Sequence, residues 1–207
     1  MGLFEFVMIL LSVVAGLGLA EVLSGTASVL RARNDIRFHW LHVLFQFGVF
    51  FALLQVWWES WALRNVPMVS FWAMLMLLAG PVCLFLMAHL LYPRPVEGAD
   101  LEAHYYRQAP LLWGLVVAGT VVGTFLKPLS FRQAVFVPEN LSGLLTMAIG
   151  MVLMLSRKPR VHAVLAPMIV IILILDTLLP RPVISTGAEQ RVDHRLHASA
   201  PSAQEPP

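Results

Sequence analysis

Apolar residues run through this 207-residue chain in six long stretches, separated by short segments that hold most of the charged residues. A stretch of about 20 apolar residues spans the hydrocarbon core of a bilayer, where a helix satisfies its own backbone hydrogen bonds. The pattern predicts an all-α integral membrane protein, a bundle of about six transmembrane helices that occupies residues 1–181. The spans are expected at about 3–30, 38–62, 66–91, 111–126, 138–156 and 161–180.

The polar breaks in this pattern are less regular than the spans. The longest break, Tyr92 to Pro110, contains prolines, a glycine and an acidic cluster, and predicts a loop or a short interfacial helix. Gly80-Pro81 predicts a kink in the third helix. The fifth stretch is short for a span unless it includes residues from Ala134 onward. From residue 182 the composition shifts to Pro, Ser, Ala, His and charge, which predicts a disordered tail over 182–207.

Composition agrees with a membrane bundle. Hydrophobic residues make up 58% of the chain and charged residues 13%, about half the charged share of a soluble domain. The net charge of +2 comes from Lys and Arg beside the apolar stretches, where they act as topology determinants, so nucleic acid is not an expected partner. The single cysteine, Cys83, excludes an intramolecular disulfide and a thiolate metal cluster.

The basic residues also predict an orientation. The first, third and fifth connections carry more Lys and Arg than the second and fourth, which favours a cytoplasmic location for connections one, three and five. With six spans both termini are then outside, in a multi-pass protein of the bacterial cytoplasmic (inner) membrane. The first stretch lacks a basic n-region and is too long for a signal peptide, so we expect a retained helix. The favoured connections hold Arg31, Arg33, Arg37, Arg94, Arg107, Arg157, Lys158 and Arg160.

A carboxylate within the first predicted helix is the first candidate functional group. Glu21 lies below the middle of that helix, and carboxylates in membrane spans are rare and usually functional. It shares a helical stripe with small residues, a face suited to close contact between helices. The alternative is a structural hydrogen bond from Glu21 to a neighbouring helix. The other members of the stripe are Gly18, Ser24, Gly25 and Ser28.

Histidines at comparable depth extend this first polar set. His42 and Gln46 share one face of the second helix, and His89 lies near the end of the third. Glu21 together with these side chains can pass protons or bind a cation, because a low dielectric raises the pKa of a carboxylate and imidazoles titrate near neutrality. Interfacial anchoring is the alternative role for the histidines, most of all for His39 and His162.

A second polar set is expected at the opposite end of the bundle. Gln55 and Glu59 share a face of the second helix, and Asp176 lies about one turn from the end of the sixth. These carboxylates form either ion pairs with nearby arginines or the outer mouth of a pathway. The pathway hypothesis therefore includes Glu21, Ser24, His42, Gln46, His89, Glu59 and Asp176.

Cofactor chemistry has one candidate site. Two histidines on different helices can hold a b-type haem, and His42 with His89 meets that requirement at the level of depth. No zinc-binding H-E-x-x-H, P-loop, G-x-S-x-G or dinucleotide motif occurs, so no metal site is expected and an enzyme is not favoured. The identity of any cofactor is not given by these patterns.

Three functions follow from these residues, and the first is preferred because polar side chains occur at both ends while no catalytic signature does. The first is a small channel or transporter subunit that moves protons, cations or a small solute. The second is a haem- or quinone-linked redox membrane protein. The third is a non-catalytic assembly or accessory subunit whose Gly18 and Gly25 face binds another membrane helix. The lipid bilayer is the expected partner in each, with a homo-oligomer or a membrane partner subunit beside it.

Overall fold

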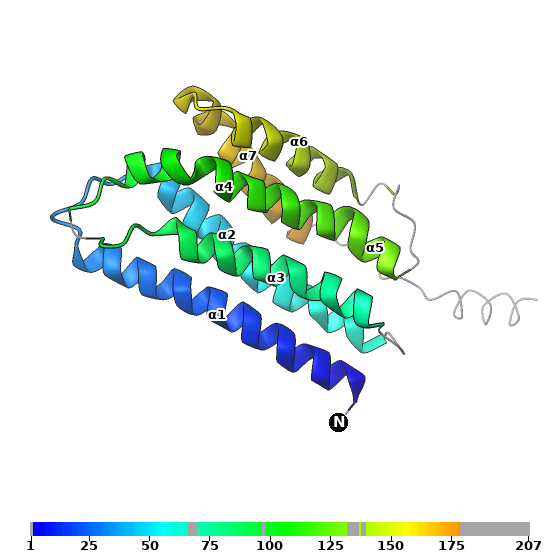
Figure 1. The fold of residues 1–207 in the computed structure, drawn as a ribbon. Coiled ribbons are helices and arrows are strands. Elements are labelled where there is room, and N and C mark those ends of the chain that lie inside the picture. The colour runs from blue at the N-terminus through cyan, green and yellow to red at the C-terminus, as the bar shows by residue number, and fades with distance from the viewer. Residues whose placement is uncertain (1, 66–69, 97, 132–136, 138–139, 179–207) are drawn as a thin grey trace, which may run out of the picture.

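The computed structural model describes residues 2–65, 70–96, 98–131, 137 and 140–178, and their regular secondary structure is helical. Successive long helices run antiparallel and are joined by short connections (Figure 1). The elements are α1 (Leu3–Arg31), α2 (Trp40–Glu59), the 3₁₀ helix η1 (Ser60–Asn65), α3 (Phe71–Leu91), α4 (Leu101–Val121), the π-helical turn η2 (Val122–Leu126), α5 (Lys127–Ser130), α6 (Leu141–Leu155) and α7 (Pro159–Leu178).

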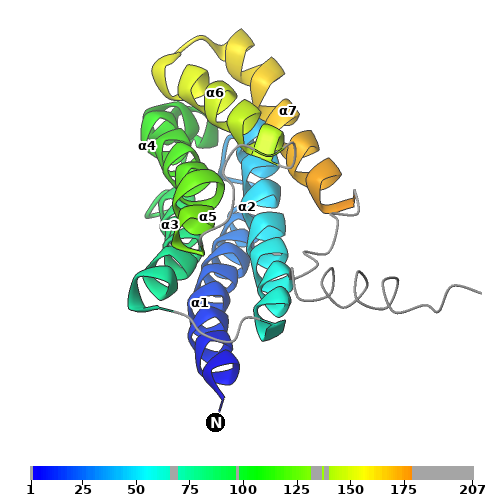
Figure 2. The same ribbon diagram turned by 90° about the vertical axis from the view of Figure 1, so that its right-hand side faces the viewer.

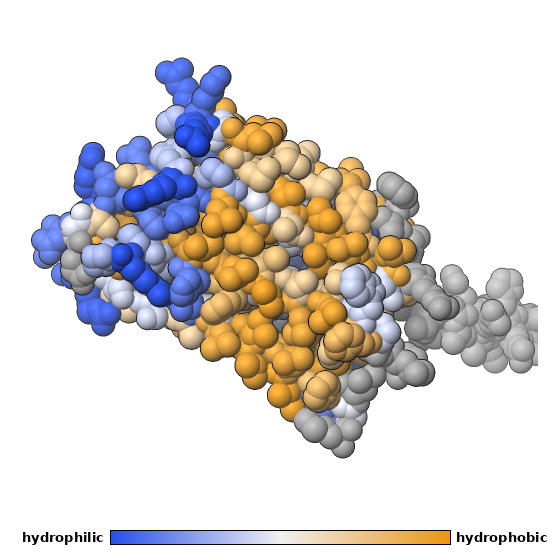
Figure 3. All heavy atoms as spheres, viewed as in Figure 1, coloured by the Kyte–Doolittle hydropathy of each residue, from blue (hydrophilic) through white to orange (hydrophobic). Residues whose placement is uncertain are grey.

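Five segments of the described chain are long and apolar enough to cross a membrane, which indicates an integral membrane protein. They are α1, α2, α3, the continuous segment from α4 to the end of α5, and α7. The sixth helix, α6, has 15 residues and is shorter than these. The all-α bundle is thus confirmed, with five candidate spans and a sixth, shorter apolar helix. Figure 3 shows apolar side chains over most of the face in view.

The long helices form two groups of three. In the first group α1 packs against α2 and α3, and in the second α6 packs against α4 and α7. The groups meet where α3 contacts α4 and where α2 contacts α7, so α2 packs against helices of both groups (Figure 2). This arrangement leaves α2, α3, α4, α6 and α7 around a common interior region.

The first, third and fifth connections lie at the same end of the bundle, as the alternation of spans requires (Figure 1). In Figure 3 hydrophilic residues gather at this end. We call it the basic end, because its connections and flanking helix ends carry the eight Lys and Arg side chains at positions 31, 33, 37, 94, 107, 157, 158 and 160. The other end holds the start of α1, the end of α2 and the end of α7.

The fourth long helix starts at Leu101 rather than at the predicted residue 111. Asp100 caps it, since its side chain accepts hydrogen bonds from the backbone N–H groups of Glu102 and Ala103. The second half of the polar break is therefore the first turns of a membrane-length helix, and Pro110 lies inside it. A hydropathy window misses such turns because they are polar, whereas the capping residue Asp100 can be recognised in the sequence.

Other boundaries differ by a few residues. The second helix ends at Glu59 and continues as η1, while α3 starts after Ser70, whose hydroxyl accepts a hydrogen bond from Ala73 N–H at 3.1 Å. Residues 66–69 of the third predicted span and the predicted tail over 182–207 lie outside the described residues.

The apolar core is concentrated between the two groups in the half nearer the basic end. Its fully buried side chains come from α1, α2, α3, α4 and α6, so burial of apolar area joins both groups into one bundle. Its most buried leucines, each at most 1% exposed, are Leu41, Leu53, Leu91, Leu112 and Leu153.

Candidate functional site

A cavity of about 330 Å³ lies between the two helix groups. Its walls come from α2 and α3 on one side and from α4, η2, α6 and α7 on the other. The volume falls in the range of small-molecule sites, about 300–1,000 Å³. A cavity of this size between helix groups is the strongest candidate site in the described part of the chain.

Most of the cavity wall is apolar. Its deep end, toward the basic end of the bundle, is formed by Phe45 of α2 and Trp113 of α4, whose rings meet edge to face at a centroid distance of 5.1 Å. Both side chains are almost completely buried. Further wall residues include Leu84, Met87, Val116, Ile169 and Val170.

Polar side chains gather at the opposite end of the cavity, which we call its polar end. Gln55 Nε2 donates to Glu59 Oε1 at 2.9 Å, and Ser142 Oγ donates to Asp176 Oδ1 at 3.0 Å. These bonds hold both carboxylates in the wall. The polar end consists of Gln55, Glu59, Thr124, Lys127, Asn140, Ser142 and Asp176.

The π-helical turn η2 lies in the wall beside the polar end. Such turns widen a helix locally and occur frequently at functional sites. Here Thr124 is 6% exposed, and its backbone carbonyl accepts a hydrogen bond from Asn140 Nδ2 at 3.3 Å. Gly123, in the same turn, lines the cavity and has nothing within 4 Å of an added Cβ. The turn therefore contributes both a polar side chain and open space.

A buried hydrogen-bonded layer lies beyond the deep end of the cavity. Trp113 Nε1 donates to the Tyr105 hydroxyl at 3.3 Å, and that hydroxyl lies 3.1 Å from His162 Nδ1. His162 Nε2 in turn lies 2.9 Å from the backbone oxygen of Ser156. The layer connects α4 to α7 and lies on the basic-end side of Trp113.

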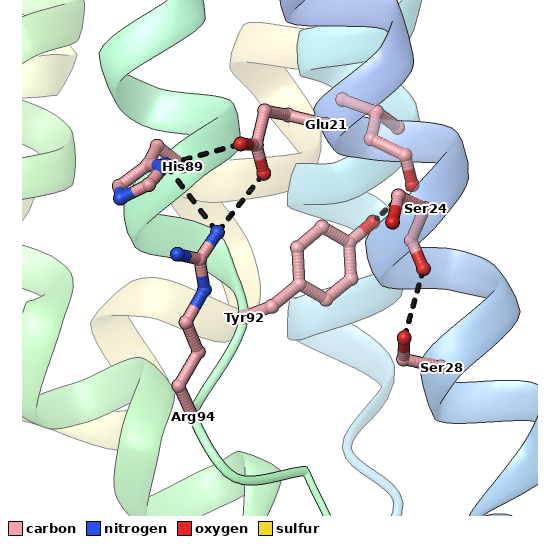
Figure 4. A network of polar contacts seen from close by, with 7 residues as sticks. Glu21, Ser24, Ser28, His89, Tyr92 and Arg94 are labelled. Atoms are coloured by element: carbon pink, nitrogen blue, oxygen red, sulfur yellow. Dashed lines mark hydrogen bonds and ion pairs between the residues drawn. The ribbon is translucent and has the colours of Figure 1, made fainter.

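The predicted carboxylate of α1 pairs with the α3 end rather than with the cavity. Glu21 Oε1 lies 3.2 Å from His89 Nδ1, and Glu21 Oε2 accepts from Arg94 Nη2 at 3.2 Å (Figure 4). The side chains of Glu21, His89 and Arg94 are 29%, 44% and 63% exposed. This set is an ion-pair cluster on the α1–α3 surface and is not part of the cavity wall.

Tyr92 occupies the small-residue stripe of α1 (Figure 4). Its hydroxyl donates to the Val22 backbone oxygen at 3.0 Å and lies 3.1 Å from Thr26 Oγ1. A Cβ at Gly25 would overlap the Tyr92 ring, and burial raises the pKa of Tyr92 to about 12. Glycine is needed at this position because the ring approaches the α1 backbone closely.

The remaining predicted residues of this set have separate neighbours. Gln46 Nε2 donates to Thr26 Oγ1 at 2.7 Å, which links α2 to α1. Ser24 is exposed, and its backbone oxygen accepts from Ser28 Oγ. His42 is 1% exposed, lies edge-on to the Tyr92 ring at 5.6 Å, and has no hydrogen-bond partner for either ring nitrogen among the described residues.

The haem hypothesis for His42 and His89 stays a prediction. The two imidazoles have different surroundings, since His42 is buried against Tyr92 while His89 is partly exposed and bonded to Glu21. A visible absorption spectrum of purified protein tests the hypothesis, because a Soret band lost in His42→Ala or His89→Ala would assign the pair to haem. In the described residues no three His, Cys, Asp or Glu side chains are arranged to hold a metal ion.

Of the predicted site residues, the cavity brings together Glu59 and Asp176, while the structure places the other five elsewhere. Sequence reasoning missed Thr124, Lys127 and Ser142. One signal was present in the chain, the repeat Gly-Thr-Val-Val-Gly-Thr over residues 119–124. Four-residue spacing puts both Gly-Thr pairs on one helix face, and Gly119, Thr120, Gly123 and Thr124 all line the cavity.

Comparison with known proteins adds no relative. No protein-family model matches the chain, and no curated protein and no solved structure is significantly similar to it.

Proposed function

We propose that this chain is a small channel or carrier subunit of a membrane transport system. The cavity between the two helix groups is part of the route of the transported solute. The observation that carries this proposal is the cavity itself, with an apolar interior and polar side chains gathered at one end of the bundle. Binding sites between helices of a bundle commonly have this form.

The two ends of the cavity differ in a way that suits transport. The polar end contains hydrogen-bonding and charged groups from α2, α5, α6 and α7. The deep end stops at Phe45 and Trp113, with the buried Tyr105–His162 layer behind them. A carrier needs a route that is closed toward one side while solute occupies it from the other, and this asymmetry meets that need.

The orientation belongs to the same proposal. Eight Lys and Arg side chains lie at the basic end, and the positive-inside rule supports a cytoplasmic location of that end in a bacterial cell. The polar end of the cavity then faces the outer side of the inner membrane. The transported solute enters from that side.

The native cysteine offers a direct test. Cys83 is the single cysteine of the chain and lines the cavity. In sided proteoliposomes, the membrane-impermeant cation MTSET (2-(trimethylammonium)ethyl methanethiosulfonate) should modify Cys83 from the face at which the polar end lies. MTSET added at the face of the basic end should modify it much more slowly. Cys83→Ser gives the background of the assay.

Two glycine variants show whether the reagent arrives through the cavity. A Cβ at Gly119 would lie 3.7 Å from the Cβ of Cys83, so Gly119→Leu should shield the thiol and slow the reaction. Gly16→Leu is the matched control, because Gly16 is exposed on α1 and an added Cβ meets nothing within 4 Å. If the membrane-permeant N-ethylmaleimide reacts with Cys83 while MTSET fails from both faces, the cavity is not a route for solutes.

A further inference from the structure

We infer that the solute taken by this cavity is a small amphipathic organic molecule. Its apolar body lies against Phe45 and Trp113, and its polar head lies at the end lined by Glu59, Lys127 and Asp176. This inference rests on the proposed function and narrows it, because it selects an organic amphiphile over a proton or an inorganic cation.

The deep part of the cavity favours an apolar body. Phe45, Trp113, Leu84 and Met87 line it with rings and aliphatic groups. The one polar atom of the indole, Nε1, is already bonded to Tyr105. An ion that entered this part would lose its hydration without gaining ligands, which is expensive, whereas an apolar group gains from leaving water.

The polar end favours a hydrogen-bonding head. Lys127 supplies donors there, while Glu59 and Asp176 supply carboxylate oxygens. The Gln55–Glu59 and Ser142–Asp176 bonds orient the two carboxylates relative to the helices that carry them. Because charged groups are confined to this end, a solute with polarity at one end fits only one way round.

Glycines leave parts of the cavity wall without side chains. Gly80 of α3 and Gly123 of η2 line the cavity, and an added Cβ at either meets nothing within 4 Å. The nearest atom to a Cβ at Gly119 is the Cys83 Cβ, at the distance of ordinary van der Waals contact. At these three positions an added Cβ would therefore meet no neighbour closer than ordinary van der Waals contact.

Trp113 provides a reporter inside the cavity. It is 2% exposed, whereas the other five tryptophans, at positions 40, 57, 58, 61 and 72, are between 45% and 72% exposed. A protein that keeps Trp113 and has phenylalanine at those five positions reports on the deep end. A matched protein that keeps only Trp58 reports on the exterior of the bundle.

The experiment is quenching of this fluorescence in nanodiscs by 8-bromooctanoate and 8-bromooctylammonium, with aqueous iodide as the inorganic comparison. We expect at least one bromooctyl probe to quench Trp113 saturably, and Gly119→Leu to weaken that quenching by about tenfold or more, which is a loss of one or more decades in apparent affinity. Gly16→Leu should leave it unchanged. Quenching of Trp58 should rise linearly with probe concentration and should be the same in both glycine variants, because it reflects partition of the probe into lipid.

Two results would overturn the inference. One is quenching of Trp113 that is linear with probe and unaffected by Gly119→Leu. The other is quenching of Trp113 by iodide as strong as that by the bromooctyl probes, because the cavity would then admit hydrated ions to its deep end. If Cys83 reacts with MTSET from the polar-end face while either result holds, the transport route stands and only the solute class is wrong.

A second measurement avoids the five tryptophan replacements. In the otherwise native chain, octanoate or octylammonium at saturating concentration should slow alkylation of Cys83 by N-ethylmaleimide. The same compounds should give no protection in Gly119→Val, where a branched side chain beside Cys83 competes for the space. Equal protection in both proteins would overturn the inference independently of the fluorescence.

Discussion

Arg37 and Asp100 join two connections at the basic end through side chain and backbone together. Arg37 Nη1 donates to Asp100 Oδ2 at 3.0 Å. The backbone of Arg37 also donates to Ala99 O and accepts from Leu101 N–H, each at 3.1 Å, which forms an isolated parallel bridge. The Asp100 carboxylate therefore both binds the α1–α2 connection through Arg37 and caps the start of α4.

This relationship predicts a loss of stability in acid. Hydrogen bonds from the backbone N–H of Ala103, together with the nearby Arg37 guanidinium, hold the pKa of Asp100 below its usual value. Because the pKa of Asp100 is lower in the folded state, its carboxylate stabilises the fold at pH values above the usual aspartate pKa of about 4. This stabilisation is lost as the pH falls through the lowered pKa. Unfolding by sodium dodecyl sulfate, followed by circular dichroism, should show the midpoint of the native chain falling below about pH 4.

Asp100→Asn should lower stability at neutral pH and flatten the acid limb of this profile. Asp35→Asn, in the connection to which Arg37 belongs, is the control and should retain the native slope. An unchanged acid limb in Asp100→Asn would show that the cap and the ion pair do not contribute to the stability of the bundle.

Substitution of Gly25 by a larger residue should lower the free energy of unfolding, although glycine in the interior of a helix is usually replaced with a gain in stability. A Cβ at this position would overlap the ring of Tyr92, which is held by Val22 and Thr26 and has little freedom to move. Overpacking of this kind costs about 1–3 kcal/mol, so Gly25→Ala should lower the free energy of unfolding by that amount. Gly16→Ala should instead be neutral or stabilising by up to about 1 kcal/mol, since alanine is the better helix former.

The double variant separates this explanation from a general intolerance at Gly25. In a Tyr92→Ala background the ring is absent, and Gly25→Ala should then cost far less than it does alone. Additive costs in the two single variants and the double variant would contradict the proposed clash.

Alkaline pH should weaken the contact between α1 and the end of α3. The pKa of Tyr92 is raised to about 12, because burial disfavours the phenolate. The neutral Tyr92 phenol therefore contributes fully to the free energy of unfolding below the usual tyrosine pKa of about 10. That contribution is lost as the pH rises toward 12, and the loss is on the order of 2 kcal/mol in total. The free energy of unfolding should therefore fall over this range, with the ring of neighbouring His42 losing its packing partner as the contact opens.

Tyr92→Phe isolates this effect from the titration of other groups. The variant loses the bonds to Val22 and Thr26 at all pH values, and its unfolding free energy should depend less on pH between 10 and 12 than that of the native chain. Parallel profiles for the two proteins would mean that Tyr92 does not titrate at the α1 contact.

Neutralising Glu21 distinguishes the cavity from the route predicted by sequence. Glu21 pairs with His89 and Arg94 outside the cavity wall, so Glu21→Gln should leave MTSET modification of Cys83 and probe quenching of Trp113 unchanged. Its effect on stability should stay within about 1 kcal/mol, as for other partly exposed ion pairs. If Glu21→Gln abolishes both signals in a folded protein, the pathway runs along α1 and α3 as the sequence alone indicated.

Apolar stretches along the chain were sufficient to predict the helical bundle and the clustering of basic residues at one end. Both depend on local quantities, namely the length of an apolar run and the alternation of direction between successive helices. The start of α4 at Leu101 was also encoded locally, in the Asp100 cap. Hydropathy did not detect it because the first turns of the helix are polar.

Only the tertiary structure decided which polar residues share a site. Glu59 and Asp176 are 117 positions apart and meet Thr124 and Ser142 around one cavity, whereas Glu21 faces the surface between α1 and α3. The physical reason is that a lipid-facing side chain, a core side chain and a cavity wall are all apolar in a membrane bundle. Hydropathy therefore cannot tell these three faces of a helix apart, and the way α2, α3, α4, α6 and α7 pack determines which face each residue occupies.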